Sequence, residues 1–287
     1  MNIGIPISKT AYTPESYAYY KYLTNKGHDV QLDYDLDPHN DINIYFMGLK
    51  PFWKKEKGRA KEIHEYQSLS TPPYANVKNK VKKYINRKPD GRIFLNSFIK
   101  NDLNFSDTKP FIYRDMGVDE ALFQIPNPSP SYDVVYCGSI SGRVGLIKVL
   151  LNIAKFYRVI VVGEVTEEEK RILSVKNITL TGMVSREELP EIYREARFGL
   201  NFTPNIYPYN IQTSTKTLEY LASGLGVISN KYEWAEYFFN KINYHPIWLD
   251  TNICNIIAEA PPPIESYSWE KVLDYSGFME FLNECIE

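Results

Sequence analysis

The sequence predicts an α/β protein with two domains, each built around a doubly wound parallel sheet. Three apolar runs that end in glycine, at 132–138, 158–163 and 178–182, have the length and composition of buried strands. They alternate with segments of helical periodicity, which is typical of a parallel sheet with crossover helices. The length of 287 residues is sufficient for two domains of about 100–150 residues each.

The first half of the chain shows the same organisation. The residues at 2–7 predict a first strand, and those at 16–25 predict a helix that Gly27 ends. Further strands are expected at 29–33, 42–46, 91–97 and 109–114.

The second half continues the alternation after its first strand. A helix is predicted from one apolar face, which consists of Leu146, Val149, Leu150, Ile153 and Ala154. The segment 185–188 has the Ser-x-x-Glu pattern of a capping box and begins another helix, and 198–202 is the next strand.

The proline-rich segment 125–130 marks the boundary between the domains, because alternating prolines make a stiff, extended linker. We assign 1–125 to an N-terminal domain and 132–267 to a C-terminal domain. A final helical segment begins near Ser268.

The segment 213–228 is the most informative part of the chain. Leu218, Leu221 and Ala222 form one helical face, Gly224 ends the helix, and a short apolar strand follows. Hydroxyl groups and backbone N–H groups precede this helix at its positive end, which suits an anion such as a diphosphate. Glu219, one turn into the helix, could accept hydrogen bonds from a ribose diol. An ordinary helix–glycine–strand unit is the alternative.

The run K-T-L-E-Y-L-A-S-G-L-G-V-I from Lys216 to Ile228 resembles the nucleotide-sugar signature of retaining GT-B glycosyltransferases of family 4. The segment 116–123, with its Gly-Val-Asp-x-x-x-Phe pattern, resembles the end of the first domain in that family. The resemblance implies the GT-B fold, in which two Rossmann-like domains face each other across a cleft. It also implies that a C-terminal helix at about 268–287 packs back on the first domain.

The resemblance further implies roles for individual residues. Glu219 would hold the donor ribose, the loop at 213–216 would lie against the phosphates, and the turn at 182–184 would read the base. Arg143 and Lys148 resemble the Arg/Lys pair of the family, and His64 resembles a histidine that faces the donor sugar. The donor-binding positions are Gly138, Ser139, Gly163, Gly182, Met183, Val184, Thr213, Ser214, Thr215, Lys216 and Glu219. The catalytic positions are His64, Arg143 and Lys148.

The sequence departs from the family at one position. The family often has another glutamate eight positions before the one that matches Glu219, and this chain has Ile211 there. Two alternatives to a transferase therefore stay open, a non-catalytic nucleotide-sugar-binding accessory subunit and a GT-B nucleotide-sugar epimerase.

No metal or other cofactor is expected. The segment 33–37 contains an Asp-x-Asp pattern, but it follows a strand in the N-terminal half, where a solvated acidic loop is the better interpretation. The three cysteines, Cys137, Cys254 and Cys285, are too few and too irregular for a disulfide framework or a zinc site. They indicate free thiols in a reducing cytosol. No apolar run is long enough for a transmembrane helix, and the N-terminus lacks the features of a signal peptide.

The charge is uneven although the net formal charge is only −2. Residues 50–100 contain 14 basic and 4 acidic residues. Within them, Val77, Val81, Tyr84 and Ile85 form an apolar stripe among lysines. One interpretation is a helix that packs through this stripe and exposes a solvated basic face. The other is adhesion to an anionic membrane surface. Nucleic acid is not expected as a partner, because no recognition motif accompanies the charge.

The sequence therefore predicts a glycosyltransferase of the hexosyltransferase kind. It would move a sugar from a nucleotide sugar to a hydroxyl of a glycan or a lipid-linked glycan, as in polysaccharide biosynthesis. The resemblance implies a metal-independent, retaining reaction. The expected location is the cytoplasm, with peripheral binding to the inner face of the membrane as the alternative.

Overall fold

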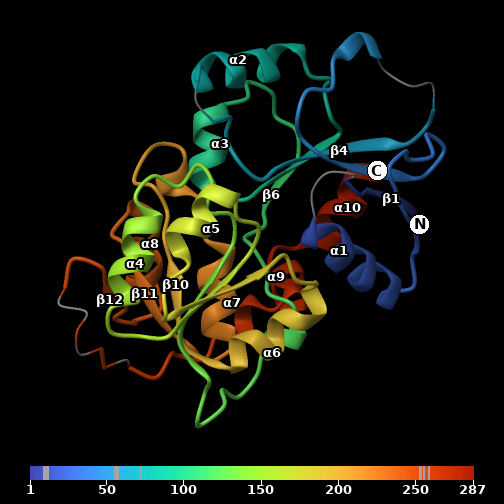
Figure 1. Cartoon of the computed structure of the whole chain (residues 1–287). Helices are drawn as coiled ribbons and strands as arrows, with labels where there is room; N and C mark the ends of the chain where they lie inside the picture. The colour runs from blue at the N-terminus through green and yellow to red at the C-terminus, as the bar shows by residue number, and fades with distance from the viewer. Residues whose placement is uncertain (9–12, 55–57, 72, 252–253, 255, 258) are drawn as a thin grey trace. The chain divides into compact units, whose positions relative to one another are not determined.

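A computed structural model of the chain describes residues 1–287 except 9–12, 55–57, 72, 252–253, 255 and 258 (Figure 1). The chain forms two compact units. The first consists of Met1–Gly117 together with Ser268–Glu287, and the second consists of Val118–Tyr267. None of the helices among the described residues combines the length and the hydropathy that a membrane-spanning helix requires.

The first unit is built on a six-stranded parallel sheet in the order β2-β1-β3-β4-β5-β6. Its strands are β1 (Asn2–Pro6), β2 (Asp29–Asp33), β3 (Ile42–Phe46), β4 (Lys61–Tyr66), β5 (Gly91–Phe94) and β6 (Phe111–Tyr113). Its helices are α1 (Pro14–Asn25), α2 (Ala75–Ile85), α3 (Ser97–Leu103), α9 (Trp269–Tyr275) and α10 (Phe278–Ile286), with a short 3-10 helix η1 (Phe52–Lys54).

The C-terminal helices belong to the core of this first unit. The ring centroid of Phe278 lies 4.8 Å from that of Tyr19 in α1, and the Trp269 ring packs edge-on against the same tyrosine. The Tyr22 hydroxyl also donates to Asp274 at 2.6 Å. Figure 1 shows α9 and α10 (red) beside α1 (blue), so the two ends of the chain build one core.

The second unit contains another six-stranded parallel sheet, in the order β12-β11-β10-β7-β8-β9. Its strands are β7 (Tyr132–Cys137), β8 (Val159–Val162), β9 (Ile178–Gly182), β10 (Ala196–Asn201), β11 (Gly226–Ser229) and β12 (Ile247–Trp248). Its helices are α4 (Leu146–Ile153), α5 (Glu167–Leu173), α6 (Leu189–Arg194), α7 (Thr215–Ala222) and α8 (Glu233–Lys241). Short 3-10 helices are η2 (Glu120–Leu122), η3 (Arg186–Glu188), η4 (Tyr209–Ile211) and η5 (Glu265–Tyr267).

Most predicted elements are found. The strands predicted at 29–33, 42–46 and 178–182 have these same bounds. The strand predicted at 91–97 is shorter, because Asn96 caps α3 by accepting a hydrogen bond from the N–H of Ile99. The sequence analysis did not predict β4 as a strand. Cys137 and Cys285 are buried, and no disulfide joins any of the three cysteines.

A close contact joins α7 to the second sheet. The ring of Tyr220 lies directly on Gly199 in β10, where an added Cβ would come within 2.1 Å of the ring. The Tyr220 hydroxyl then accepts a hydrogen bond from the N–H of Cys137 at the end of β7. The absence of a side chain at Gly199 therefore allows one tyrosine to tie α7 to two neighbouring strands.

We expect Gly199→Ala to destabilise the protein by about 1–3 kcal/mol, because a methyl group there overpacks the core. Urea unfolding measures this change. Gly48→Ala is the matched control, since an added Cβ at Gly48 has no heavy atom within 4 Å. Equal stability of the two variants would contradict the assigned packing.

Candidate functional site

Three glycines lie in a row at the carboxyl end of the second sheet. The N–H of Gly138 donates to Val162, and the N–H of Gly163 donates to the carbonyl of Gly182, both at 2.9 Å. All three have positive φ, which glycine adopts most readily. A Cβ on Gly163 would lie 2.4 Å from the Gly138 carbonyl oxygen. The structure thus brings the ends of β7, β8 and β9 together, and ligands bind at this edge of parallel sheets.

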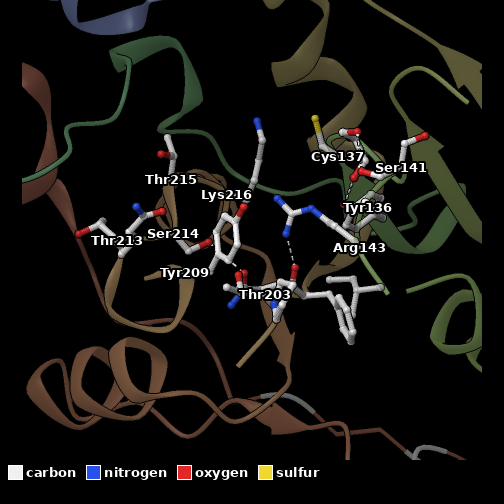
Figure 2. Close-up of a pocket in the computed structure, with 17 residues that line it drawn as sticks. Tyr136, Cys137, Ser141, Arg143, Thr203, Tyr209, Thr213, Ser214, Thr215 and Lys216 are labelled. Carbon is white, nitrogen blue, oxygen red and sulfur yellow. Dashed lines mark hydrogen bonds between the residues drawn. The ribbon is translucent and has the colours of Figure 1, made fainter. Parts of the chain in front are cut away.

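A cavity of about 520 Å³ lies in the second unit, between the loop after β7 and the segment that leads from β10 into α7. The volume is within the usual range for small-molecule sites, about 300–1,000 Å³. Figure 2 shows Ser141 and Arg143 on one side of the cavity and the start of α7 on the other. Six of the predicted site residues line it, namely Ser139, Arg143, Thr213, Ser214, Thr215 and Lys216.

A buried asparagine positions the start of α7. Asn201, the last residue of β10, donates to Ser229 at 2.9 Å and to Tyr232 at 3.0 Å, and it accepts from Ser214 at 2.9 Å. Ser214 is in turn the N-cap of α7 and accepts from the N–H of Thr217. The helix N-terminus is therefore fixed beside the strand end, with its first N–H groups at the cavity.

The cavity is suited to an anion. Arg143 and Lys216 both line it, and the described residues around it include no aspartate or glutamate. Arg143 is held by a hydrogen bond from its Nη1 to the carbonyl oxygen of Phe202. Hydroxyl groups of Ser141 on one side and of Thr213 and Thr215 on the other add further donors around the cavity (Figure 2). A helix N-terminus, two cations and several hydroxyls together match the needs of a phosphate group.

Glu219 lies one turn into α7 with only 1 % of its surface exposed. Its Oε1 accepts from Arg186 at 2.9 Å. Its Oε2 accepts from Lys216 and from the hydroxyl of Tyr193, each at 2.9 Å. Burial by itself raises the pKa of Glu219, but the charges of Lys216 and Arg186 outweigh burial and hold this pKa below its ordinary value. The carboxylate is therefore charged at neutral pH and held by three donors.

Both oxygens of Glu219 are thus already paired, so the carboxylate is not open to a ribose diol in this structure. Glu219 is separated from the cavity by Lys216, which lines the cavity and also pairs with Glu219. On the other side Arg186, which follows the turn after β9, covers the second oxygen. The predicted turn at 182–184 is thus linked to Glu219 through Arg186, although Met183 itself is exposed.

Lys148 is not part of this cavity. It lies on α4 and is exposed, and it lines a different surface concavity of about 890 Å³ together with Arg143, Val144 and Ile147. The structure therefore separates the predicted Arg/Lys pair, with Arg143 bordering both spaces and Lys148 only one.

The structure places His64 in the interior of the first unit, and its contact with a donor sugar stays a prediction. His64 lies in the middle of β4 in the first unit, and none of its surface is exposed. Burial lowers its pKa, although the Glu62 carboxylate at 3.5 Å opposes this shift. In this structure the imidazole is enclosed by protein and presents no exposed atom to a ligand.

The described residues contain no group of three or more His, Cys, Asp or Glu side chains arranged to hold a metal ion. In the acidic loop after β2, Asp33 accepts from the N–H of Tyr34 and Asp37 accepts from the N–H of His39. These carboxylates serve as turn acceptors, in agreement with the interpretation of this segment as a solvated acidic loop.

Several residues of the site were not predicted. Arg186 and Tyr193 belong to the helical segment that the sequence analysis identified only by its capping box. Asn201 and Tyr209 also border the cavity. The signal for Asn201 was available, because a polar residue that ends an apolar strand often lies at the functional edge of a parallel sheet.

Residues 144–246 match a protein-family model that is described as glycosyl transferase-like. The matched segment includes Lys216 and Glu219. No curated protein matches the chain significantly.

The structure is similar to several solved glycosyltransferase structures. AviGT4, a glycosyltransferase involved in avilamycin A biosynthesis, has a TM-score of 0.67 at 11% identity, with 99% of this chain and 98% of that chain covered. Sucrose-phosphate synthase from Thermosynechococcus elongatus has a TM-score of 0.62 at 13% identity, with 100% and 95% covered. HepE from Anabaena, in complex with UDP-glucose, has a TM-score of 0.57 at 11% identity, with 100% and 92% covered. Together with the two parallel sheets, these similarities show that the chain has the GT-B fold.

We expect Glu219→Gln to lower the free energy of unfolding at neutral pH by about 1–3 kcal/mol, because it removes a charged acceptor from three donors. Since the pKa of Glu219 is lower when folded than its ordinary value of 4.5, its stabilisation is complete above that pH. It is lost as the pH falls through the folded pKa. The variant should therefore show a shallower loss of stability in acid.

Urea unfolding near neutral pH and below pH 4.5 measures both effects. Glu191→Gln is the control, because that carboxylate on α6 is 71% exposed and lies 3.9 Å from Arg194. If the two variants have the same acid dependence, the ion-pair network does not control the charge of Glu219.

Proposed function

We propose that this protein is a glycosyltransferase that moves a sugar from a nucleotide sugar to an acceptor hydroxyl. The observation that carries the proposal is the cavity lined by Arg143 and Lys216, at the N-terminus of α7 and next to the buried Glu219. The glycosyl transferase-like segment at 144–246 includes all of these residues except Arg143, which directly precedes it.

The cavity accounts for the chemistry of the leaving group. When the bond between the anomeric carbon and the diphosphate oxygen breaks, negative charge develops on the nucleoside diphosphate. Arg143 can form paired hydrogen bonds with phosphate oxygens, and the Lys216 ammonium adds a second positive charge. Fixed cations at this position stabilise the transition state more than the ground state. We therefore propose a reaction that needs no metal ion and, by resemblance to family 4, retains the anomeric configuration.

The proposed role of Glu219 is to accept hydrogen bonds from the ribose of the donor. Its two oxygens are already paired, so a ribose diol has to exchange with one of the present donors. Arg186 is the better candidate for exchange, because it comes from a different element, whereas Lys216 lies three residues from Glu219 at the start of the same helix. Lys216 and Tyr193 would continue to hold the carboxylate in place.

The bound UDP-glucose in the HepE structure supports a nucleotide sugar as the donor. Recognition of the sugar cannot use a glutamate at position 211, because this chain has a buried isoleucine there. Its neighbour Gln212 lines the cavity and offers an amide for the sugar hydroxyls. We propose that Gln212 supplies the polar contact that the family obtains from its first glutamate.

The proposed acceptor is a hydroxyl of a glycan or a lipid-linked glycan, and we assign its recognition to the first unit. A non-catalytic nucleotide-sugar-binding subunit is the second candidate, and the apolar, buried Ile211 favours it. The two functions differ in whether nucleoside diphosphate is released.

We expect Arg143→Ala to lower the rate of nucleoside diphosphate release by about a hundredfold or more, because a fixed cation at the leaving group is lost. The same variant should lose most of the thermal stabilisation that a nucleotide sugar gives to the wild type. A screen of UDP-, GDP- and ADP-sugars with glycan acceptors measures both quantities.

Lys155→Ala is the control, since this exposed lysine lies outside the cavity. Wild-type behaviour of Arg143→Ala in both assays would refute the site. Donor binding without diphosphate release in any acceptor mixture would establish the accessory subunit, and sugar interconversion without an acceptor would indicate an epimerase.

A further inference from the structure

Helix α2 presents an apolar stripe to solvent. Val77 is 57% exposed and Tyr84 is 74% exposed, and Val81 lies between them on the same face. Tyr74, which directly precedes the helix, is 78% exposed and continues the stripe. Side chains at 74, 77, 81 and 84 are spaced by three and four residues, so they form one continuous line along the helix.

The orientation of α2 is fixed by its opposite face. Asn79 is the buried residue of this helix. It accepts a hydrogen bond from the N–H of Ser70 at 2.9 Å and donates to Asp102 at 3.2 Å. The interpretation that the apolar stripe packs against the protein is therefore wrong for most of the stripe. The helix attaches through a polar residue, and Ile85 is the one stripe member that is half-buried.

Two exposed aromatic residues adjoin the end of this helix. Phe52 and Trp53 in η1 are 62% and 61% exposed, and their rings contact each other edge-on. The segment is tied to the residues after α2 by a bridge between Pro51 and Asn86 and by the N–H of Arg87, which donates to Lys50 at 2.9 Å. The α2 surface, defined as Phe52, Trp53, Tyr74, Val77, Val81 and Tyr84, therefore belongs to one region of the first unit.

The charge around the α2 surface is positive. The helix contains four lysines and no acidic residue. Lys78 and Lys83 donate to the backbone carbonyls of Thr71 and Asn104, which accept a hydrogen bond without neutralising the charge. Lys80 on the helix and Lys88 just beyond it are exposed.

We propose that the α2 surface docks the protein on an anionic lipid bilayer. Tyrosine and tryptophan side chains favour the interface between headgroups and acyl chains, and valines on the same line can enter it. The lysines beside them then lie at the level of the phosphate headgroups, where anionic lipids attract them. A second copy of this chain is a poorer occupant, because pairing two such faces would bring like charges together. The proposal is independent of the transferase activity.

The experiment is co-sedimentation of the full chain with vesicles. One set contains phosphatidylcholine alone, and the other contains about one third phosphatidylglycerol. We expect binding to the anionic vesicles to be at least about tenfold stronger, because several lysines approach the surface together. Added salt should weaken this binding, since it screens charges at the surface.

Two variants test the apolar and the basic parts separately. The double variant Trp53→Ser and Tyr84→Ser removes two exposed rings, and Lys80→Glu with Lys88→Glu reverses two exposed charges. Each should weaken vesicle binding by about tenfold. The control is Phe156→Ser with Tyr237→Ser, because these rings of the second unit are 50% and 57% exposed. Thermal melting verifies that all variants are folded.

The proposal fails if wild-type protein binds neutral and anionic vesicles equally or binds neither. It also fails if both α2-surface variants bind like the control variant. Sedimentation velocity tests whether a second copy of this chain binds the α2 surface instead. A dimer that the Trp53→Ser and Tyr84→Ser variant abolishes, without vesicle binding by the wild type, would assign the α2 surface to self-association.

Discussion

The buried carboxylate of Glu219 is the constraint on which the arrangement of the second unit depends. A charged group with 1 % exposure requires partners that satisfy it. Here the partners are Lys216 on the same helix, Tyr193 on α6, and Arg186, which follows the turn after β9. The ion pairs therefore connect the start of α7 with the far edge of the sheet. Because Lys216 also lines the cavity, binding of an anion there changes the electrostatic surroundings of Glu219 directly.

The parallel sheet makes this arrangement possible. All six strands of the second unit end at the same edge, so loops that are distant in sequence meet there. Gly163 allows the loop after β8 to approach the loop after β7 closely, because an added Cβ there would lie 2.4 Å from the Gly138 carbonyl oxygen. Asn201 fixes the loop after β10, because its amide bonds to both Ser214 and Ser229. The backbone positions of Arg143 and Lys216 thus follow from the loops at this edge, and hydrogen bonds to the Phe202 carbonyl and the Glu219 carboxylate hold their side chains.

Much of this could be predicted from the sequence, because its signals are local. The period of apolar residues, the glycines after strands and the cap before α7 act within a few positions, and they placed most strands. The six predicted residues of the cavity were assigned largely through the resemblance to family 4. The pairing of Glu219 with Arg186 could not be predicted in this way, since the two residues are 33 positions apart. Nor does the local pattern around His64 indicate that this residue of β4 is fully buried, because burial depends on elements that are distant in sequence.

Helix α2 also shows what a local sequence pattern leaves undetermined. Its periodicity correctly indicates an amphipathic helix, but periodicity does not say which face meets the protein. The orientation of α2 is instead indicated by Asn79, whose amide forms hydrogen bonds with Ser70 and Asp102 that a valine could not form. These two hydrogen bonds satisfy the amide, whose burial without them would cost about 1–3 kcal/mol. The apolar stripe is then left on the outside, as an exposed line of valines and tyrosines among lysines.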